Sequence, residues 1–244
     1  MDLGIAGRTA LVTASSKGLG LATAVALAAE GVNVTVCGRR GDVLAQAAAT
    51  VAAAAGDSGA GVHAIVVDVT ERDAPTRLVA ETVERFGGLQ ILVANAGGPP
   101  TGRALDLDDE AIMAAVNANL LSTVRLVRET LPHQRMAGWG RIVALTSFTV
   151  KQPLPNLALS NLARTGLWGW AKTAAGDLRG SGITLNLACP GPHATDRMLG
   201  LGGGAAELGD PGDFGRVVAF LCSAAAAFIT GSAVVVDGGA VLGL

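Results

Sequence analysis

The stretch TASSKGLG, residues 13–20, joins a predicted strand, Thr9 to Thr13, to a predicted helix, Leu19 to Glu30. Glycines in such a loop let the backbone approach a pyrophosphate closely, and the amide groups and dipole at the start of the helix favour that anion. A Gly-x-Gly pair alone is weak evidence, because turns and helix starts often carry glycine. Its place between a strand and a helix predicts a phosphate-binding loop.

Around this loop, short β-branched runs alternate with longer stretches of helical periodicity. The predicted strands are Thr9 to Thr13, Val32 to Cys37, Val62 to Val67, Leu89 to Ala94, Arg141 to Thr146, Ile183 to Ala188 and Ala233 to Val236. The predicted helices are Leu19 to Glu30, Gly41 to Ala55, Glu71 to Phe86, Asp108 to Met136, Asn156 to Leu178 and Asp213 to Ala226. The Gly/Ala-rich stretches Ala52 to Gly61 and Gly200 to Gly209 are predicted loops. This alternation predicts one Rossmann-type α/β domain over residues 1–244, a doubly wound parallel sheet of about seven strands with helices on both faces.

Composition and net charge indicate which kinds of molecule the chain binds and which it does not. A net charge of -2 with scattered basic residues gives no positive field for nucleic acid, so we expect a small-molecule partner. The cysteines Cys37, Cys189 and Cys222 are far apart and odd in number, which favours buried reduced thiols over disulfides or zinc. The start lacks the pattern of a secretory signal, and no apolar run reaches the ~18 residues of a membrane span. We therefore expect a cytoplasmic protein that does not enter a membrane.

Further motifs follow the predicted strands in order. Asp68-Val69 follows the third strand, Asn95-Ala96-Gly97 the fourth and Pro190-Gly191-Pro192-His193-Ala194-Thr195 the sixth, and Asp237-Gly238-Gly239 follows the last. Together with the loop at residues 13–20 they resemble the short-chain dehydrogenase/reductase family, from Gly7 to the C-terminus. The family's Thr-Gly-x-x-x-Gly-x-Gly motif has glycine where this chain has Ala14, and alanine there would shift the first turn if the position requires a positive φ.

The resemblance implies roles for these motifs in binding a dinucleotide. Asp68 would accept a hydrogen bond from the adenine amine beside the Val69 backbone, and Thr195 would lie near the nicotinamide carboxamide. The residues implied for cofactor binding are Thr13, Ser15, Ser16, Lys17, Gly18, Leu19, Gly20, Arg39, Arg40, Asp68, Val69, Asn95, Ala96, Gly97, Arg164, Pro190, Gly191 and Thr195. In this family the long helices of two subunits commonly pack across a two-fold axis, so the resemblance also implies a homodimer or homotetramer.

The charges after the second strand favour one cofactor. NADP carries a 2′-phosphate that attracts cations, whereas NAD offers a ribose diol to a carboxylate. Arg39 and Arg40 end the second strand without an acidic residue, and Lys17 adds a third cation. NADP(H) is therefore expected and NAD(H) is less favoured. The alternative is that these arginines are ordinary solvated charges at a helix start.

The catalytic segment departs from the family. Ser147 occupies the family's serine position, but Ser160 and Arg164 stand where the family has Tyr-x-x-x-Lys, and the chain contains no tyrosine. The i to i+4 spacing keeps both side chains on one helix face. Asn119 matches the asparagine that holds a proton-relay water, and Asn117 is a rival for that role.

Replacing the phenol removes a general acid or base, a contribution of about 100-fold to 10,000-fold in rate. Serine is a far weaker acid than a phenol, and arginine is a poor proton donor. Substitute proton carriers are His193, Lys151 or a water held by Ser147, Ser160 and Asn119. His63 and His133 are interpreted as structural.

The resulting expectation is an NADP(H)-dependent oxidoreductase acting on a carbonyl or alcohol, similar to 3-oxoacyl-carrier-protein reductases, with an atypical proton-transfer site. The short glycine-rich stretch Asp196 to Gly209 suggests an open pocket for a small or carrier-bound carbonyl substrate. The alternatives are a redox-silent nucleotide-binding protein or non-catalytic subunit, and non-redox chemistry such as dehydration on the same fold.

Overall fold

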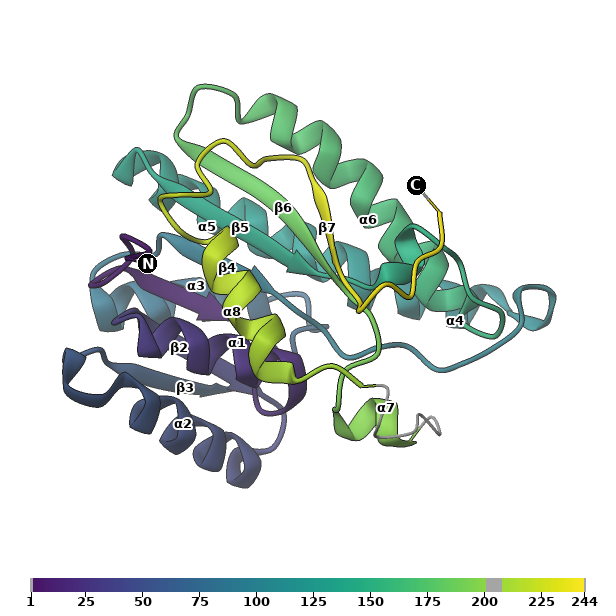
Figure 1. Ribbon diagram of the computed structural model, residues 1–244, viewed down its shortest axis with the longest axis horizontal. Helices are drawn as coiled ribbons and strands as arrows, with labels where there is room; N and C mark the ends of the chain where they lie inside the picture. The colour runs from purple at the N-terminus through teal and green to yellow at the C-terminus, as the bar shows by residue number, and fades with distance from the viewer. Residues whose placement is uncertain (1, 201–207, 244) are drawn as a thin grey trace.

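The computed structural model describes residues 2–200 and 208–243. Within these ranges, seven strands form one all-parallel sheet with the order β3-β2-β1-β4-β5-β6-β7 (Figure 1). The strands are β1 (Thr9–Val12), β2 (Asn33–Gly38), β3 (Val62–Val66), β4 (Ile91–Ala94), β5 (Gly140–Leu145), β6 (Ile183–Pro190) and β7 (Ala233–Val236). The predicted fold class and the predicted strand count are confirmed.

Helices cover both faces of the sheet (Figure 1). On one face lie α1 (Gly18–Ala29), α2 (Gly41–Ala55) and α8 (Pro211–Leu221). On the other lie α3 (Ala74–Phe86), α5 (Ser122–Ala137) and α6 (Ala158–Asp177), with α4 (Asp109–Val116) packed on α6, while the short α7 (Asp196–Gly200) follows β6. Short 3-10 turns span Gly56–Ser58, Ala104–Asp106 and Phe148–Val150.

The core consists of two apolar layers, one on each side of the sheet. Successive strand side chains point to opposite faces, so Leu11 joins the layer under α3, α5 and α6, and Val12 joins the layer under α1, α2 and α8. Both residues have no exposed surface, as a parallel sheet covered on both faces requires. The cysteines Cys37, Cys189 and Cys222 are free and buried in these layers.

Three predicted helices differ from the structure. The helix predicted from Asp213 to Ala226 is α8, which spans Pro211–Leu221 and so ends before Cys222. The single helix predicted from Asp108 to Met136 is interrupted by a π turn, Asn117–Leu121, which separates α4 from α5. The helix predicted from Glu71 starts at Ala74, because Pro75 lies at its first turn, where a proline is well tolerated.

The two predicted loops are also revised. The stretch Ala52 to Gly61 is partly helical, because α2 continues to Ala55 and a 3-10 turn follows it. In the stretch Gly200 to Gly209, Gly200 ends α7 and Gly209 forms a bridge with His193. Residues 201–207 of that stretch lie outside the described residues. None of the helices described is long and apolar enough to cross a membrane.

The arrangement of strands places the site. The chain order reverses between β1 and β4, so the loops that leave these two strands diverge to opposite faces and open a crevice at their carboxyl ends. The loop at residues 13–20, the segment after β4, and the segments after β5 and β6 all meet at this edge. The fold therefore brings these motifs and Asp68-Val69 to one crevice, whereas Asp237-Gly238-Gly239 lines a different cavity.

Candidate functional site

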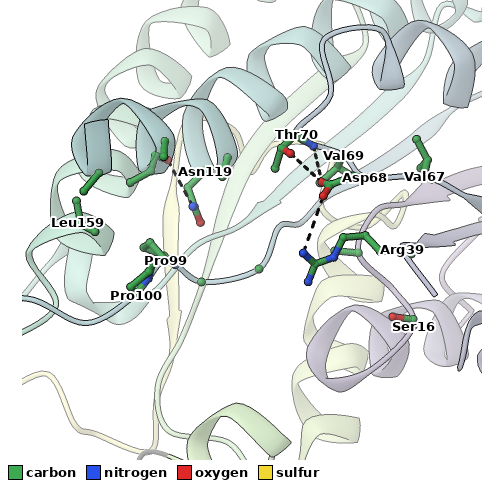
Figure 2. A pocket seen from close by; sticks show the side chains of 18 residues that line it. Ser16, Arg39, Val67, Asp68, Val69, Thr70, Pro99, Pro100, Asn119 and Leu159 are labelled. Atoms are coloured by element: carbon green, nitrogen blue, oxygen red, sulfur yellow. Dashed lines mark hydrogen bonds and ion pairs between the residues drawn. The ribbon is translucent and has the colours of Figure 1, made fainter. Parts of the chain in front are cut away.

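Two neighbouring cavities occupy this crevice and share Ala14, Gly97 and Gly98 as walls. The first, called here the β2 cavity, has a volume of about 410 Å³ and is lined by the ends of β2 and β3 on one side and by Pro99, Pro100 and α4 on the other (Figure 2). The second, the β5 cavity, has a volume of about 360 Å³ and is lined by the segments after β5 and β6 and by α6. Together they form one elongated cleft with two chemically different ends.

The loop at residues 13–20 is fixed by hydrogen bonds to the end of β4. The Thr13 hydroxyl donates to the Asn95 carbonyl at 2.7 Å and accepts from the Asn95 amide at 2.8 Å, and the Asn95 side chain donates to the Ala14 carbonyl at 3.1 Å. A Cβ on Gly20 would lie 2.6 Å from that same Ala14 oxygen, so only glycine fits there. The loop is therefore packed closely against the start of α1, and glycine at position 20 makes this packing possible.

The same loop leaves the start of α1 open towards the cleft. The helix begins at Gly18, and in the described chain the preceding Lys17 side chain does not cap it. Uncapped amides at a helix start attract an anionic group. Gly18 and Leu19 line the β5 cavity, and Ser16 lines the β2 cavity.

Ser15 has a different position from the one implied by the resemblance. Its buried hydroxyl donates to the Val12 carbonyl at 2.7 Å and accepts from the Cys37 amide at 3.0 Å. The side chain thus ties β1 to β2 beneath the cleft, because it points into the sheet, and it lines neither of the two described cavities.

The β2 cavity carries one arginine paired loosely with one carboxylate. Arg39 Nη1 lies 3.9 Å from Asp68 Oδ2, while Asp68 Oδ1 accepts from the Thr70 amide at 3.0 Å and the Thr70 hydroxyl at 2.9 Å (Figure 2). The Arg39 side chain is 76% exposed and Val69 also lines this cavity. This end of the cleft therefore offers a movable cation beside a fixed carboxylate.

The other two predicted cations are not brought to the β2 cavity. Arg40 is the exposed residue that precedes α2, and it does not line either of the two described cavities. Lys17 lines the β5 cavity, where its ammonium lies 2.8 Å from Asp196 Oδ2. Of the three cations predicted for a 2′-phosphate, only Arg39 lies at that end of the cleft in this structure. The Lys17 side chain points instead towards the carboxylate of Asp196, a contact that the sequence did not predict.

The β5 cavity brings together Ser147, Ser160 and Arg164. Ser147 caps the 3-10 turn after β5, where its Oγ accepts from the Thr149 amide at 3.2 Å and the Thr149 hydroxyl at 3.0 Å. Ser160 is buried on α6, one turn before Arg164, so the predicted shared face is present.

Arg164 is held from two sides. It donates to the Thr146 carbonyl, and its Nε and Nη2 lie 3.4 Å and 3.3 Å from Asn119 Oδ1. Desolvation, with a smaller effect from the positive charge of Arg197, lowers the pKa of Arg164 to about 10. At neutral pH the guanidinium stays charged, so it supplies a fixed positive charge near Ser160 and is not suited to act as a general acid or base.

The two candidate asparagines have different hydrogen-bond partners, and only one of them lines the cleft. Asn117 donates to the Thr70 carbonyl at 3.0 Å and accepts from Arg125 at 2.8 Å, so both ends of its amide are engaged away from Arg164. Asn119 is buried in the π turn, contacts Arg164 and lines the β2 cavity. The wide π turn brings Asn119 to the cleft while Asn117 braces the segment after β3.

The two side chains considered as substitute proton carriers, His193 and Lys151, differ in their position relative to the β5 cavity. His193 is buried, lines the β5 cavity, and has its Nδ1 3.0 Å from the Gly191 carbonyl and its ring edge-to-face with Phe214. Lys151 Nζ lies 4.1 Å from the centre of the Trp168 ring and is absent from the described lining of the cavity. His193 is thus placed at the site and Lys151 is not.

The structure adds two residues that the sequence argument missed, Asp196 and Arg197, both in the β5 cavity. No motif marks them, because their importance depends on contacts across the cleft. The remaining expected residues that line the β5 cavity are Asn95, Ala96, Gly97, Pro190, Gly191 and Thr195.

Known proteins match nearly the whole chain. The family model described as Enoyl-(Acyl carrier protein) reductase matches residues 13–241. Dehydrogenase/reductase SDR family member 4 of Homo sapiens is 34% identical, over 96% of this chain and 88% of its own length. Cis-4-hydroxycyclohexanecarboxylate dehydrogenase of Sinomonas cyclohexanicum is 32% identical, over 98% of both chains.

Solved structures agree with these sequence matches. L-sorbose reductase from Gluconobacter frateurii, complexed with NADPH and L-sorbose, superposes with a TM-score of 0.92 at 29% identity over 100% of both chains. An actinorhodin polyketide ketoreductase variant with NADPH superposes with a TM-score of 0.87 at 30% identity, over 95% of this chain and 96% of that one. With the cleft geometry described above, these matches show that the chain belongs to the short-chain dehydrogenase/reductase family of NAD(P)-dependent oxidoreductases.

Proposed function

We propose that this protein is an NADP(H)-dependent oxidoreductase acting on a carbonyl or alcohol, with a serine at the position of its proton-transfer residue. The observation that carries the proposal is a single cleft with Arg39 at one end and Ser147, Ser160 and Arg164 at the other. Two structural relatives are described with NADPH, which supports the choice of cofactor.

The described residues fit a dinucleotide. The glycine cradle at Gly20 and the uncapped start of α1 suit a pyrophosphate, and Arg39 suits a 2′-phosphate. Thr195 and the Pro190–Gly191 turn line the end that would receive the nicotinamide. When bound there, the nicotinamide would supply or accept a hydride.

The side chains of the β5 cavity would act on the substrate oxygen. Ser147 and Ser160 hydroxyls would donate hydrogen bonds to it, and the fixed charge of Arg164 would stabilise the negative charge that develops during reduction. Arg164 also holds Asn119 in place. The proton would come from a water in the cleft or from His193, since none of these hydroxyls is acidic enough to deliver it at neutral pH.

The absence of tyrosine favours a second candidate, a redox-silent nucleotide-binding protein or non-catalytic subunit. Titration with NADPH and NADH, followed by NADPH-oxidation assays on a panel of ketones and 3-oxoacyl substrates, distinguishes the two. Turnover with any substrate supports the oxidoreductase. Tight NADPH binding without turnover, together with activity gained in the Ser160→Tyr, Arg164→Lys double variant, supports the silent protein. Product formed without a change in nicotinamide absorbance would instead indicate non-redox chemistry.

The substrate side of the cleft opens into an apolar groove of about 900 Å³, whose walls include Leu107, Phe148, Leu154 and Met198. Phe148 and Met198 also line the β5 cavity, so groove and cavity join. An elongated or carrier-bound carbonyl compound would place its apolar body there.

We further propose a single functional domain over residues 1–244 and a cytoplasmic homodimer or homotetramer, in line with the family.

A further inference from the structure

The segment after β6 lies across the cleft and contacts both of its walls. Thr195 faces the glycine-rich loop so closely that a Cβ on Gly18 would lie 3.4 Å from its methyl group. Asp196 then pairs with Lys17 on that same wall at 2.8 Å. The next residue, Arg197, reaches the opposite wall, where Nη1 and Nη2 donate to the carbonyls of Gly98 and Pro99, both at 2.9 Å.

Arg197 stands where the two cavities meet. Gly98 is one of the three residues that the β2 and β5 cavities share, and a Cβ built on it would lie 2.4 Å from the central carbon of the Arg197 guanidinium. The guanidinium therefore rests directly against the backbone at this point, a position open to it because residue 98 is glycine.

The contacts of Arg197 leave its charge and part of its donor set available. The two carbonyls are neutral, and they engage two of the five N–H groups of the guanidinium. Its neighbour Asp196 pairs with Lys17 instead, at 2.8 Å. Across the cleft, Gly18 and Leu19 at the uncapped start of α1 line the same β5 cavity.

We propose that Arg197 is a cofactor-binding residue that clamps the pyrophosphate of the dinucleotide against the start of α1. This inference rests on the proposed function, because it assumes a dinucleotide that spans both cavities. A molecule with its adenosine in the β2 cavity and its nicotinamide in the β5 cavity carries its pyrophosphate past Gly97 and Gly98, the junction that Arg197 covers. The arginine fork matches phosphate oxygens in geometry and charge.

Titration of NADPH against three variants tests the clamp. Arg197→Met removes the charge and keeps most of the side-chain length, Arg197→Lys keeps the charge and loses the fork, and Arg179→Met is the control, an exposed arginine that follows α6. We expect Arg197→Met to weaken NADPH binding by roughly 10-fold or more, because hydrogen bonds from arginine to phosphate are among the strong ones. Arg197→Lys should lose less, and Arg179→Met should bind as the wild type does.

Adenosine 2′-monophosphate, which has no pyrophosphate, is the second probe. Its affinity should be the same in Arg197→Met and wild type, while the salt dependence of NADPH binding should become shallower in the variant. Equal losses for both ligands, or an unchanged NADPH affinity, would overturn the clamp. Faster association and dissociation at unchanged affinity would show instead that Arg197 only fastens the segment. If the wild type binds no dinucleotide at all, the proposed function fails and the clamp with it.

Discussion

Ala14 has a φ of +45°, a backbone conformation that residues with a Cβ adopt at a cost of about 1–2 kcal/mol. The family's motif has glycine there, and the structure shows that the position does require a positive φ. We expect Ala14→Gly to raise the free energy of unfolding by about 0.5–1 kcal/mol, after subtracting glycine's greater freedom in the unfolded chain. Urea denaturation measures the change.

Ala45→Gly is the matched control for that substitution. Ala45 is exposed and lies inside α2, where alanine has ordinary helical geometry. Glycine there should lower the free energy of unfolding by about 0.5–1 kcal/mol. Equal destabilisation by both substitutions would show that Ala14 carries no strain.

Arg39 and Arg40 are adjacent in sequence but differ in place, since only Arg39 lines the β2 cavity. We expect Arg39→Leu to weaken NADPH binding by about 10-fold to 100-fold, the range of a charge-assisted contact to phosphate, and to leave NADH binding little changed. Arg40→Leu should have a small effect on both. Calorimetric titration of the two cofactors checks this, and a larger loss from Arg40→Leu would contradict the assignment.

Some of the site was predictable from the sequence because it depends on local spacing. Ser160 and Arg164 share a helix face at i to i+4, and the structure places both in one cavity. The direction of Lys17 was not predictable, because its partner Asp196 lies 179 positions away. Likewise, the choice between Asn117 and Asn119 depends on a π turn, which adds one residue to a helical turn and so changes which side chain faces the cleft.

At the scale of elements, α1 is positioned by the close approach of Gly20 to the preceding loop. A Cβ at this residue would lie 2.6 Å from the Ala14 oxygen and 2.8 Å from Asn95 Nδ2. Gly20→Ala should therefore displace the start of α1, lower the free energy of unfolding by about 1–3 kcal/mol, and weaken NADPH binding. Thermal melts and titration measure both effects.

Gly176→Ala supplies the control for this helix substitution. Gly176 is exposed on α6, and a Cβ there would meet nothing within 4 Å among the described residues. The substitution should be neutral or stabilise the protein by roughly 0.5 kcal/mol, as expected for alanine in place of glycine in a helix. If Gly20→Ala is equally harmless, the start of α1 tolerates displacement and the cradle argument fails.

For the whole molecule, the parallel, doubly wound sheet was the most predictable property, because alternating strands and helices with right-handed crossovers leave few topologies. Seven strands were expected from the β-branched runs, and in the structure each strand begins and ends within about two residues of its predicted bounds. The interruption between α4 and α5 and the contacts across the cleft were not predictable, since they arise only when distant segments pack together.

Both halves of the sheet contribute walls to the cleft, since Arg39 follows β2 and Ser147 follows β5. A ligand bound along its length should therefore stabilise the entire fold against heat. At a concentration about 100-fold above its dissociation constant, a ligand that binds only the folded state adds about 2.7 kcal/mol. For a chain of this size that corresponds to a rise in Tm of roughly 5–10 °C.

NADPH should raise the Tm more than NADH does at the same concentration, because only NADPH offers a 2′-phosphate to Arg39. This difference between the two cofactors should disappear in Arg39→Leu. Differential scanning fluorimetry of the wild type and that variant measures it, and equal shifts for both cofactors in the wild type would refute the preference for NADPH.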